Sequence, residues 1–138
     1  MRTKPKTLIG RIEMRIARKR DAVFLTREFR DLGGEDQVLR ALRLLVRRRR
    51  LVRLGYGVYG RAIRSRLTGS PILGTPSGFI GAARETLNKL GVVWEPGDAE
   101  KAYNAGTSTQ VPVNPVVKIR GRFARQLRYG NTRLVLER

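Results

Sequence analysis

Three arginines, Arg40, Arg43 and Arg47, are spaced so that they share one face of a helix. At 100° per residue, with Val38 at zero, they lie at about 200°, 140° and 180°, whereas the apolar Leu42 lies at about 40°. A guanidinium group is planar and donates paired hydrogen bonds, which suits phosphate oxygens and the O6 and N7 edge of guanine. An ordinary solvated helix face mixes the two signs of charge, so this cationic stripe predicts contact with nucleic acid.

Further candidates lie before and after this helix. Gln37 near the helix start can offer a bidentate amide to adenine, and Thr26 with Arg27 can bring a helix N-terminus and a cation to a phosphate. Arg48 belongs to a run of arginines that either contacts DNA or only complements the helix dipole. The predicted DNA-contacting residues are Thr26, Arg27, Gln37, Arg40, Arg43, Arg47, Arg48, Arg53, Tyr56 and Arg61.

The charge of the 138-residue chain is concentrated in its first half. The sequence holds 30 Lys and Arg against 11 Asp and Glu, a formal net charge of +19. Residues 1–66 hold 20 of the basic and 6 of the acidic residues, a net +14, and residues 67–138 carry the remaining +5. A body of this charge attracts a polyanion, and the first half is the candidate for binding it.

The composition argues against most enzyme classes. The chain has no Cys and no His, which removes thiol and imidazole catalysis and most transition-metal sites. The pattern G-x-G-x-x-G over residues 55–60 lacks the flanking strand and helix of a nucleotide site, so a β-turn is favoured. The acidic residues are explained by helix starts and surface ion pairs. We expect no catalytic residue, no cofactor and no metal.

The elements of the first half follow an order that predicts a winged helix-turn-helix in residues 1–64. Apolar residues at helical spacing predict a helix from Thr7 to about Lys19, and a short buried run follows at residues 22–25. Thr26 is expected to cap a second helix that ends before Gly33. A third helix then runs to about Arg49, and residues 51–61 form a hairpin, the wing.

Residues 65–76 are rich in Gly, Pro, Ser and Thr and are predicted to be a linker. Residues 77–138 are predicted to form a small α+β domain. It has a helix capped by Ser77, a buried strand at residues 92–94, a short helix capped by Asp98, and strands that alternate around Val117 and Ile119. A turn at residues 130–131 completes a unit that ends in antiparallel strands. The expected fold class is therefore α+β.

Two stretches of the sequence resemble a known family, the short winged-helix antitoxins of the abortive-infection AbiEi type. One is the helix-to-wing passage at residues 38–59, and the other is Ser-Thr-Gln-Val-Pro at residues 108–112 together with Tyr-Gly-Asn-Thr at residues 129–132. The resemblance implies a regulator of a type IV toxin-antitoxin operon that binds inverted repeats. It also implies a C-terminal region that antagonises a nucleotidyltransferase-like toxin.

The sequence thus predicts a duplex-DNA-binding repressor, acting as a homodimer where two half-sites are present. The alternative is a basic RNA-binding or ribosome-associated protein, in which arginines beside Phe123 and Tyr129 stack and neutralise single-stranded RNA. No stretch resembles a signal peptide or a membrane span, so we expect a cytoplasmic, nucleoid-associated protein with no membrane partner.

Overall fold

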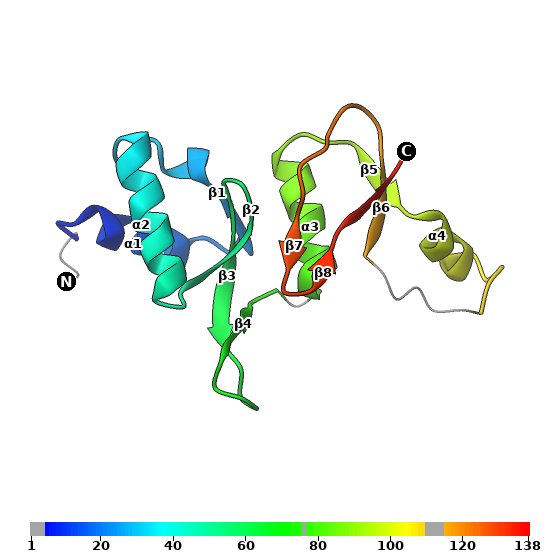
Figure 1. The fold of residues 1–138 in the computed structure, drawn as a ribbon, viewed down its shortest axis with the longest axis horizontal. Helices are drawn as coiled ribbons and strands as arrows, with labels where there is room; N and C mark the ends of the chain where they lie inside the picture. Colours follow the sequence, from blue (N-terminus) through cyan, green and yellow to red (C-terminus); the bar gives the residue numbers. More distant parts are fainter. Residues whose placement is uncertain (1–4, 76, 110–114) are drawn as a thin grey trace. The chain divides into compact units, whose positions relative to one another are not determined.

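The computed structural model describes residues 5–75, 77–109 and 115–138, and the fold is α+β, as predicted. The chain divides into two compact units, Met1–Thr75 and Pro76–Arg138 (Figure 1). No helix among the described residues is both long and apolar enough to cross a membrane.

The first unit contains α1 (Leu8–Arg18), β1 (Val23–Leu25), the 3₁₀ helix η1 (Thr26–Phe29), α2 (Glu35–Arg47), β2 (Leu51–Gly55), β3 (Val58–Arg64) and β4 (Pro71–Leu73).

Helix α1 forms where its apolar spacing predicts it. The Thr7 hydroxyl caps it by accepting the backbone N–H of Gly10 at 3.1 Å. Ile12 and Ile16 are its buried residues and face the core of the unit.

The second helix is shorter than predicted. It is a single 3₁₀ turn, and its N-cap residue is Leu25 rather than Thr26. The carboxylate of Glu28 accepts the Leu25 backbone N–H at 2.6 Å and also binds Lys19 at 3.0 Å. Arg15 donates two hydrogen bonds to Asp31 and so ties the following turn to α1. These side-chain bonds to the turn take the place of further helical bonds.

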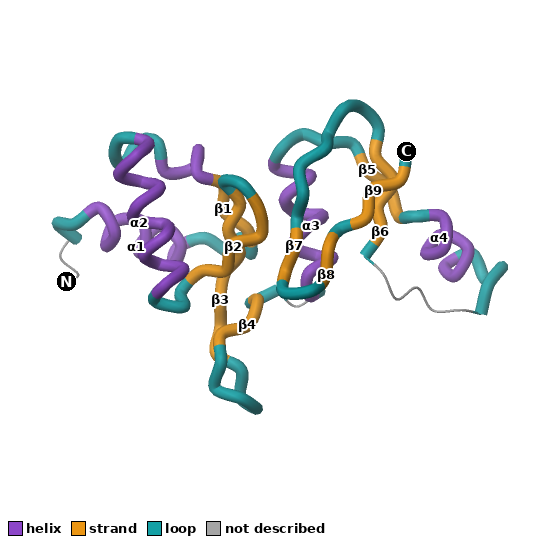
Figure 2. Tube along the Cα trace, in the orientation of Figure 1, coloured by secondary structure: helices purple, strands orange, loops and turns teal. Residues whose placement is uncertain are grey.

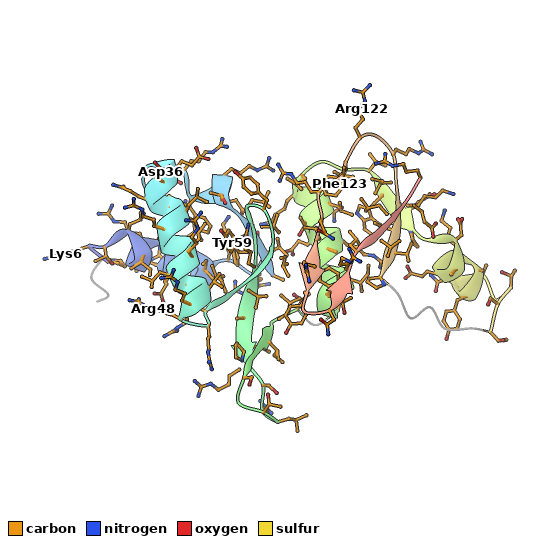
Figure 3. All side chains as sticks on the ribbon, viewed as in Figure 1. Lys6, Asp36, Arg48, Tyr59, Arg122 and Phe123 are labelled. Carbon is orange, nitrogen blue, oxygen red and sulfur yellow. The ribbon has the colours of Figure 1, made fainter. Side chains whose placement is uncertain are left out.

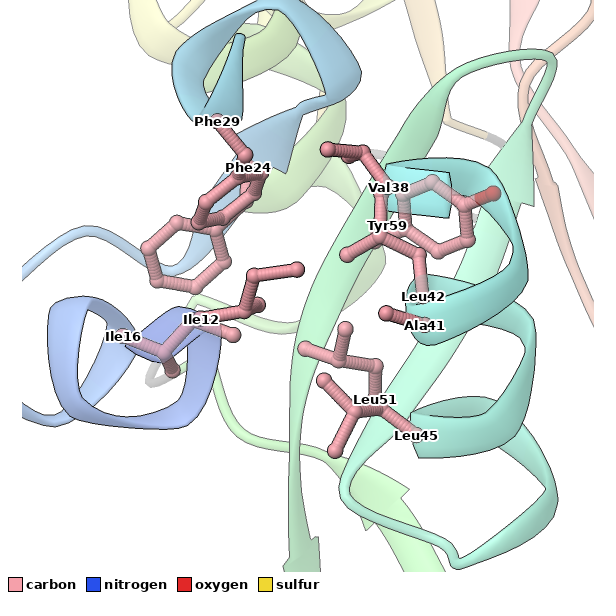
Figure 4. Packing of buried hydrophobic residues seen from close by; sticks show 10 residues of the cluster. All are labelled: Ile12, Ile16, Phe24, Phe29, Val38, Ala41, Leu42, Leu45, Leu51 and Tyr59. Atoms are coloured by element: carbon pink, nitrogen blue, oxygen red, sulfur yellow. The ribbon is translucent and has the colours of Figure 1, made fainter. Parts of the chain in front are cut away.

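Helix α2 buries the four residues that the helical pattern selects: Val38, Ala41, Leu42 and Leu45. They pack with α1 and with side chains of the sheet in one cluster (Figure 4). Phe24 and Tyr59 lie opposite each other on β1 and β3, so they share the sheet face that meets this cluster. Figure 2 shows α1 and α2 on the same side of the strands.

The strands of the first unit are antiparallel in the order β1-β3-β2, and the predicted hairpin is the β2–β3 pair. The predicted linker is wrong for most of its length. β3 continues to Arg64, and β4 pairs with it through Ala62–Leu73, Ile63–Ile72 and Arg64–Pro71. Residues 65–70 are therefore a hairpin turn, and the boundary between the units falls after Thr75. Turn-rich composition is common to linkers and hairpin turns, and only the partner strand distinguishes them.

The second unit contains α3 (Gly78–Lys89), β5 (Trp94–Pro96), α4 (Asp98–Asn104), β6 (Val116–Ile119), β7 (Arg128–Tyr129), β8 (Thr132–Arg133) and β9 (Val135–Glu137). As predicted, Ser77 is the N-cap residue of α3, Val117 and Ile119 point inward, and residues 130–131 turn the β7–β8 hairpin. No side-chain hydrogen bond accompanies the Ser77 cap.

Three details of the second unit differ from the prediction. The strand begins at Trp94, and Val93 is 65% exposed, because the helix-ending turn extends to Val92. Gly97, not Asp98, is the N-cap of α4. The last strand, β9, pairs with β6 in parallel, so among the described strands of this unit the antiparallel pairs are β5–β6 and β7–β8. Of the Ser-Thr-Gln-Val-Pro segment, residues 110–112 lie outside the described residues.

We predict that Leu42→Ala destabilises the first unit by about 2–5 kcal/mol, because Leu42 is fully buried in the cluster and truncation leaves a cavity. Chemical denaturation measures this free energy. Leu67→Ala is the matched control, since Leu67 is 96% exposed and its truncation leaves the stability within about 0.5 kcal/mol. Equal effects of the two substitutions would contradict the assigned core.

Candidate nucleic-acid interface

The predicted cationic stripe lies on the exposed surface of α2. Arg40, Arg43 and Arg47 are exposed, on the side away from the four buried residues. Gln37 is exposed in the first turn and Arg48 is exposed at the C-cap. Figure 3 labels Asp36 and Arg48 at opposite ends of this helix. The helix therefore presents guanidinium groups along most of its length on one side.

Arg53 extends this surface from the helix onto the sheet. It lies opposite Tyr59 in the β2–β3 pair, so both side chains stand on the face that carries α2. Burial raises the pKa of the Tyr59 hydroxyl, while the positive charges of Arg53 and Arg43 oppose that rise. Arg43 on α2 and Arg53 on β2 therefore both lie close enough to Tyr59 to act on its hydroxyl electrostatically. The positive charges of the helix and of the hairpin add to one positive potential on this surface.

The turn of the β2–β3 hairpin is tight and is held against η1. Tyr56 is 76% exposed at its tip, and Gly57 has a φ of +67°, which favours glycine. The Gly57 carbonyl accepts the backbone N–H of Thr26 at 3.1 Å. Thr26 therefore uses its N–H within the fold, and its contact with a phosphate stays a prediction. The Arg27 side chain beside it is exposed.

Arg61 is built into the fold, contrary to its prediction as a wing contact. Its guanidinium donates to the carbonyls of Ile16, Lys19 and Asp21 at 2.9, 2.8 and 3.0 Å. It also lies 5.3 Å from the centre of the Phe24 ring. Ile16 lies in the last turn of α1, Lys19 is its C-cap and Asp21 follows, so Arg61 ties the end of this helix to β3. The number of positive charges along the sequence does not show that the Arg61 side chain binds backbone carbonyls.

The arginine run after α2 forms its C-terminal cap. Arg50 donates its backbone N–H to the Leu45 carbonyl at 2.9 Å, and Arg49 adopts a φ of +63°. This is the geometry of a helix-ending turn in which glycine normally occupies the left-handed position. A bulky residue there is strained by about 1 kcal/mol. The strained Arg49 and the buried Tyr59 are two residues that the sequence pattern did not select.

A second cationic stretch belongs to the second unit. Residues 120–138 carry six of its basic residues and one acidic residue, whereas residues 76–119 are balanced at four of each. Arg122 lies in the loop between β6 and β7 (Figure 3), and Phe123 and Tyr129 are half-buried. Arg138 donates to the carbonyls of Gly121 and Phe123 and so closes this loop.

Acidic side chains do not gather into a metal site in the described parts of the chain. No group of three or more Asp or Glu there could hold an ion. In the second unit Arg84, Lys101 and Lys118 bind Glu100, Glu95 and Asp98 respectively. Lys101 lowers the pKa of the Glu95 carboxyl, as Arg15 does for Asp31 in the first unit.

We predict that Arg61→Ala destabilises the protein by about 2–3 kcal/mol, because three carbonyls lose a charged donor. Arg61→Lys is the matched variant: it keeps the charge but lacks the fork that reaches three acceptors, so it destabilises the fold as well. Thermal and chemical denaturation measure both effects. A fully stable Arg61→Ala protein with weakened DNA binding would instead favour the predicted wing contact.

We predict that Arg49→Gly raises the free energy of unfolding by about 1 kcal/mol, because glycine adopts a φ of +63° without strain. Arg48→Gly is the control, since Arg48 has a negative φ, and this variant gains no stability. Chemical denaturation of the two variants and of the unsubstituted protein measures these free energies of unfolding. A destabilising Arg49→Gly would show that its side chain contributes more than the backbone strain costs.

Comparison with known proteins gives a family but no functional relative. No curated protein matches the chain, and no solved structure does. The model of a family described as "Family of unknown function (DUF6088)" matches residues 11–138, which cover most of the first unit and all of the second. The chain therefore belongs to the DUF6088 family.

Proposed function

We propose that this protein is a sequence-specific, duplex-DNA-binding transcriptional regulator and that its first unit is a winged helix-turn-helix. The observation that carries the proposal is the exposed face of α2, where Arg40, Arg43 and Arg47 lie opposite a fully buried apolar stripe. A helix is narrow enough to enter the major groove, and arginine is the side chain that most often reads guanine there.

The neighbouring elements support this proposal. The order α1-β1-η1-α2-β2-β3 and the sheet order β1-β3-β2 are those expected of a winged helix. In that arrangement α2 is the recognition helix and the β2–β3 hairpin is the wing, with Arg53 and Tyr56 as its contacts. The helix before α2 is reduced to the η1 turn, and its bonds with α1 and Gly57 supply the rigidity that a longer helix would give.

The biological role that we propose is autorepression as an antitoxin of the AbiEi type, with a nucleotidyltransferase-like toxin as the partner. This part rests on the resemblance of residues 38–59, 108–112 and 129–132. It is tested by co-expression with the product of an adjacent nucleotidyltransferase reading frame. Rescue of growth by the full chain supports the role. Failure to rescue, with DNA binding intact, would leave a regulator without antitoxin activity.

RNA binding is the second candidate, and the cationic residues 120–138 favour it. The half-buried state of Phe123 and Tyr129 favours it less, because base stacking needs an accessible ring. Competition separates the two functions: the duplex from upstream of the protein's own reading frame is challenged with single-stranded RNA of equal length. Displacement at equal concentration would contradict the DNA proposal.

We predict that Arg43→Ala with Arg47→Ala weakens duplex binding by about tenfold or more at moderate salt and makes the slope of log K against log salt shallower by about 1.8, because two phosphate-neutralising or base-reading cations are lost. The measurement is a fluorescence-anisotropy titration of the upstream duplex at several salt concentrations.

The matched control is Arg18→Ala with Arg20→Ala, which removes the same charge from exposed residues at the end of α1. Its salt slope is expected to stay near the unsubstituted value. If both double variants lose affinity equally, binding depends on net charge alone and α2 is not the recognition helix. If the unsubstituted protein does not bind the duplex, the proposed function is wrong.

A further inference from the structure

The β3–β4 hairpin extends beyond the sheet of the first unit. β1 and β2 pair with β3 only as far as residues 60 and 61, whereas β3 continues to Arg64 and pairs there with β4 alone. Figure 1 shows this green hairpin projecting away from the helices and the other strands of its unit. We call residues 63–72 the arm. Apart from the pairing of its two strands, the arm has no role in the core described above.

The tip of the arm has a defined shape. The Ser65 hydroxyl accepts the backbone N–H groups of Leu67 and Thr68 at 3.2 and 3.3 Å. Ser65 also exchanges backbone bonds with Ser70 and Gly69 at 2.8 and 2.9 Å. The tip residues are thus held by short local bonds and not by packing. This arrangement presents Leu67, which is 96% exposed, at the end of the hairpin.

The arm exposes both apolar and cationic side chains. Ile63 and Ile72 lie opposite each other and are 50% and 38% exposed, and Leu67 adds a third apolar side chain. Arg64 and Arg66 alternate with them and are exposed. Apolar side chains flanked by arginines are the chemistry of arms that enter the minor groove, where the apolar group separates stacked bases and the cations neutralise phosphates.

The base of the arm adjoins the cationic end of α2. Ala62 donates its backbone N–H to the Arg50 carbonyl at 3.3 Å, so the arm starts beside the turn that ends this helix. A helix lying in the major groove has the phosphate backbone at its ends, and the minor groove lies beyond that backbone. The arm is therefore positioned, within the same unit, to continue from the α2 surface.

We propose that the arm is a second DNA-binding element, which inserts Leu67 between adjacent base pairs in the minor groove and kinks the duplex. The inference rests on the proposed function, because it requires duplex DNA as the partner. Arg64 and Arg66 hold the arm at the phosphates on either side. A second copy of the chain is a poorer partner for the arm, because the positive charges of two arms brought together would repel each other.

The experiment uses the full chain and the duplex from upstream of its reading frame, with 2-aminopurine placed at successive positions and a donor–acceptor dye pair at the two ends. Binding of the unsubstituted protein raises the 2-aminopurine fluorescence at one base step and shortens the end-to-end distance. Leu67→Ala abolishes both signals and lowers the affinity about tenfold, the loss expected when one leucine side chain is no longer buried. Val93→Ala, an exposed position in the second unit, is the matched control and leaves both signals intact.

The two arginines are tested separately from the leucine. Arg64→Gln with Arg66→Gln makes the salt slope shallower by about 1.8, as expected for two lost phosphate contacts. Unchanged fluorescence, distance and slope in the arm variants, with Arg43 and Arg47 still required, would overturn the arm proposal and leave the proposed function standing. Loss of self-association in Leu67→Ala, measured by sedimentation, with unchanged DNA bending would assign the arm to a second copy and also overturn it.

Discussion

The packing of the apolar stripe of α2 is the interaction on which the rest of the first unit depends. Val38, Leu42 and Leu45 are almost completely buried against α1 and the sheet. Burying that stripe removes apolar surface from water and fixes the rotation of the helix about its axis. Because the apolar face points into the core, the arginines on the opposite face of the helix point toward solvent. One hydrophobic contact thus sets both the stability of the unit and the direction of its cationic surface.

The arginines divide into those that hold the fold and those that remain exposed. Arg15 and Arg61 bind Asp31 and a set of carbonyls, and each joins elements that are distant in sequence. Arg43, Arg47 and Arg53 are exposed, and the charges of Arg43 and Arg53 act on Tyr59. The net charge of the first half overstates the charge available to a ligand, because some of it is engaged internally. Of the exposed arginines, Arg40, Arg43 and Arg47 share one face of α2, and Arg53 lies on the sheet face that carries this helix.

Elements whose apolar residues recur at a regular spacing could be predicted from the sequence. Strands that form only by pairing with a segment distant in the sequence could not. α1 and α2 follow from apolar spacing, and the alternation of Val117 and Ile119 predicts β6. The β4 strand could not be predicted, because its turn-rich sequence becomes a strand only against the long β3. The parallel pairing of β9 with β6 likewise depends on tertiary contacts. At the site, helical spacing selected the α2 arginines, but nothing local in the sequence distinguishes an arginine that binds backbone carbonyls, such as Arg61, from one that is free to bind a ligand.

The most direct test of the account is a measurement of where the α2 surface lies on DNA. The chain has no cysteine, so Gln37→Cys provides a single thiol for a tethered iron chelate that cleaves nearby DNA. If α2 is the recognition helix, the bound upstream duplex is cleaved at a few adjacent nucleotides flanking one major-groove segment in each half-site. The same chelate attached through Val93→Cys serves as the control for random cleavage. Uniform cleavage along the duplex from position 37, or none, would contradict the assignment of α2 as the recognition helix.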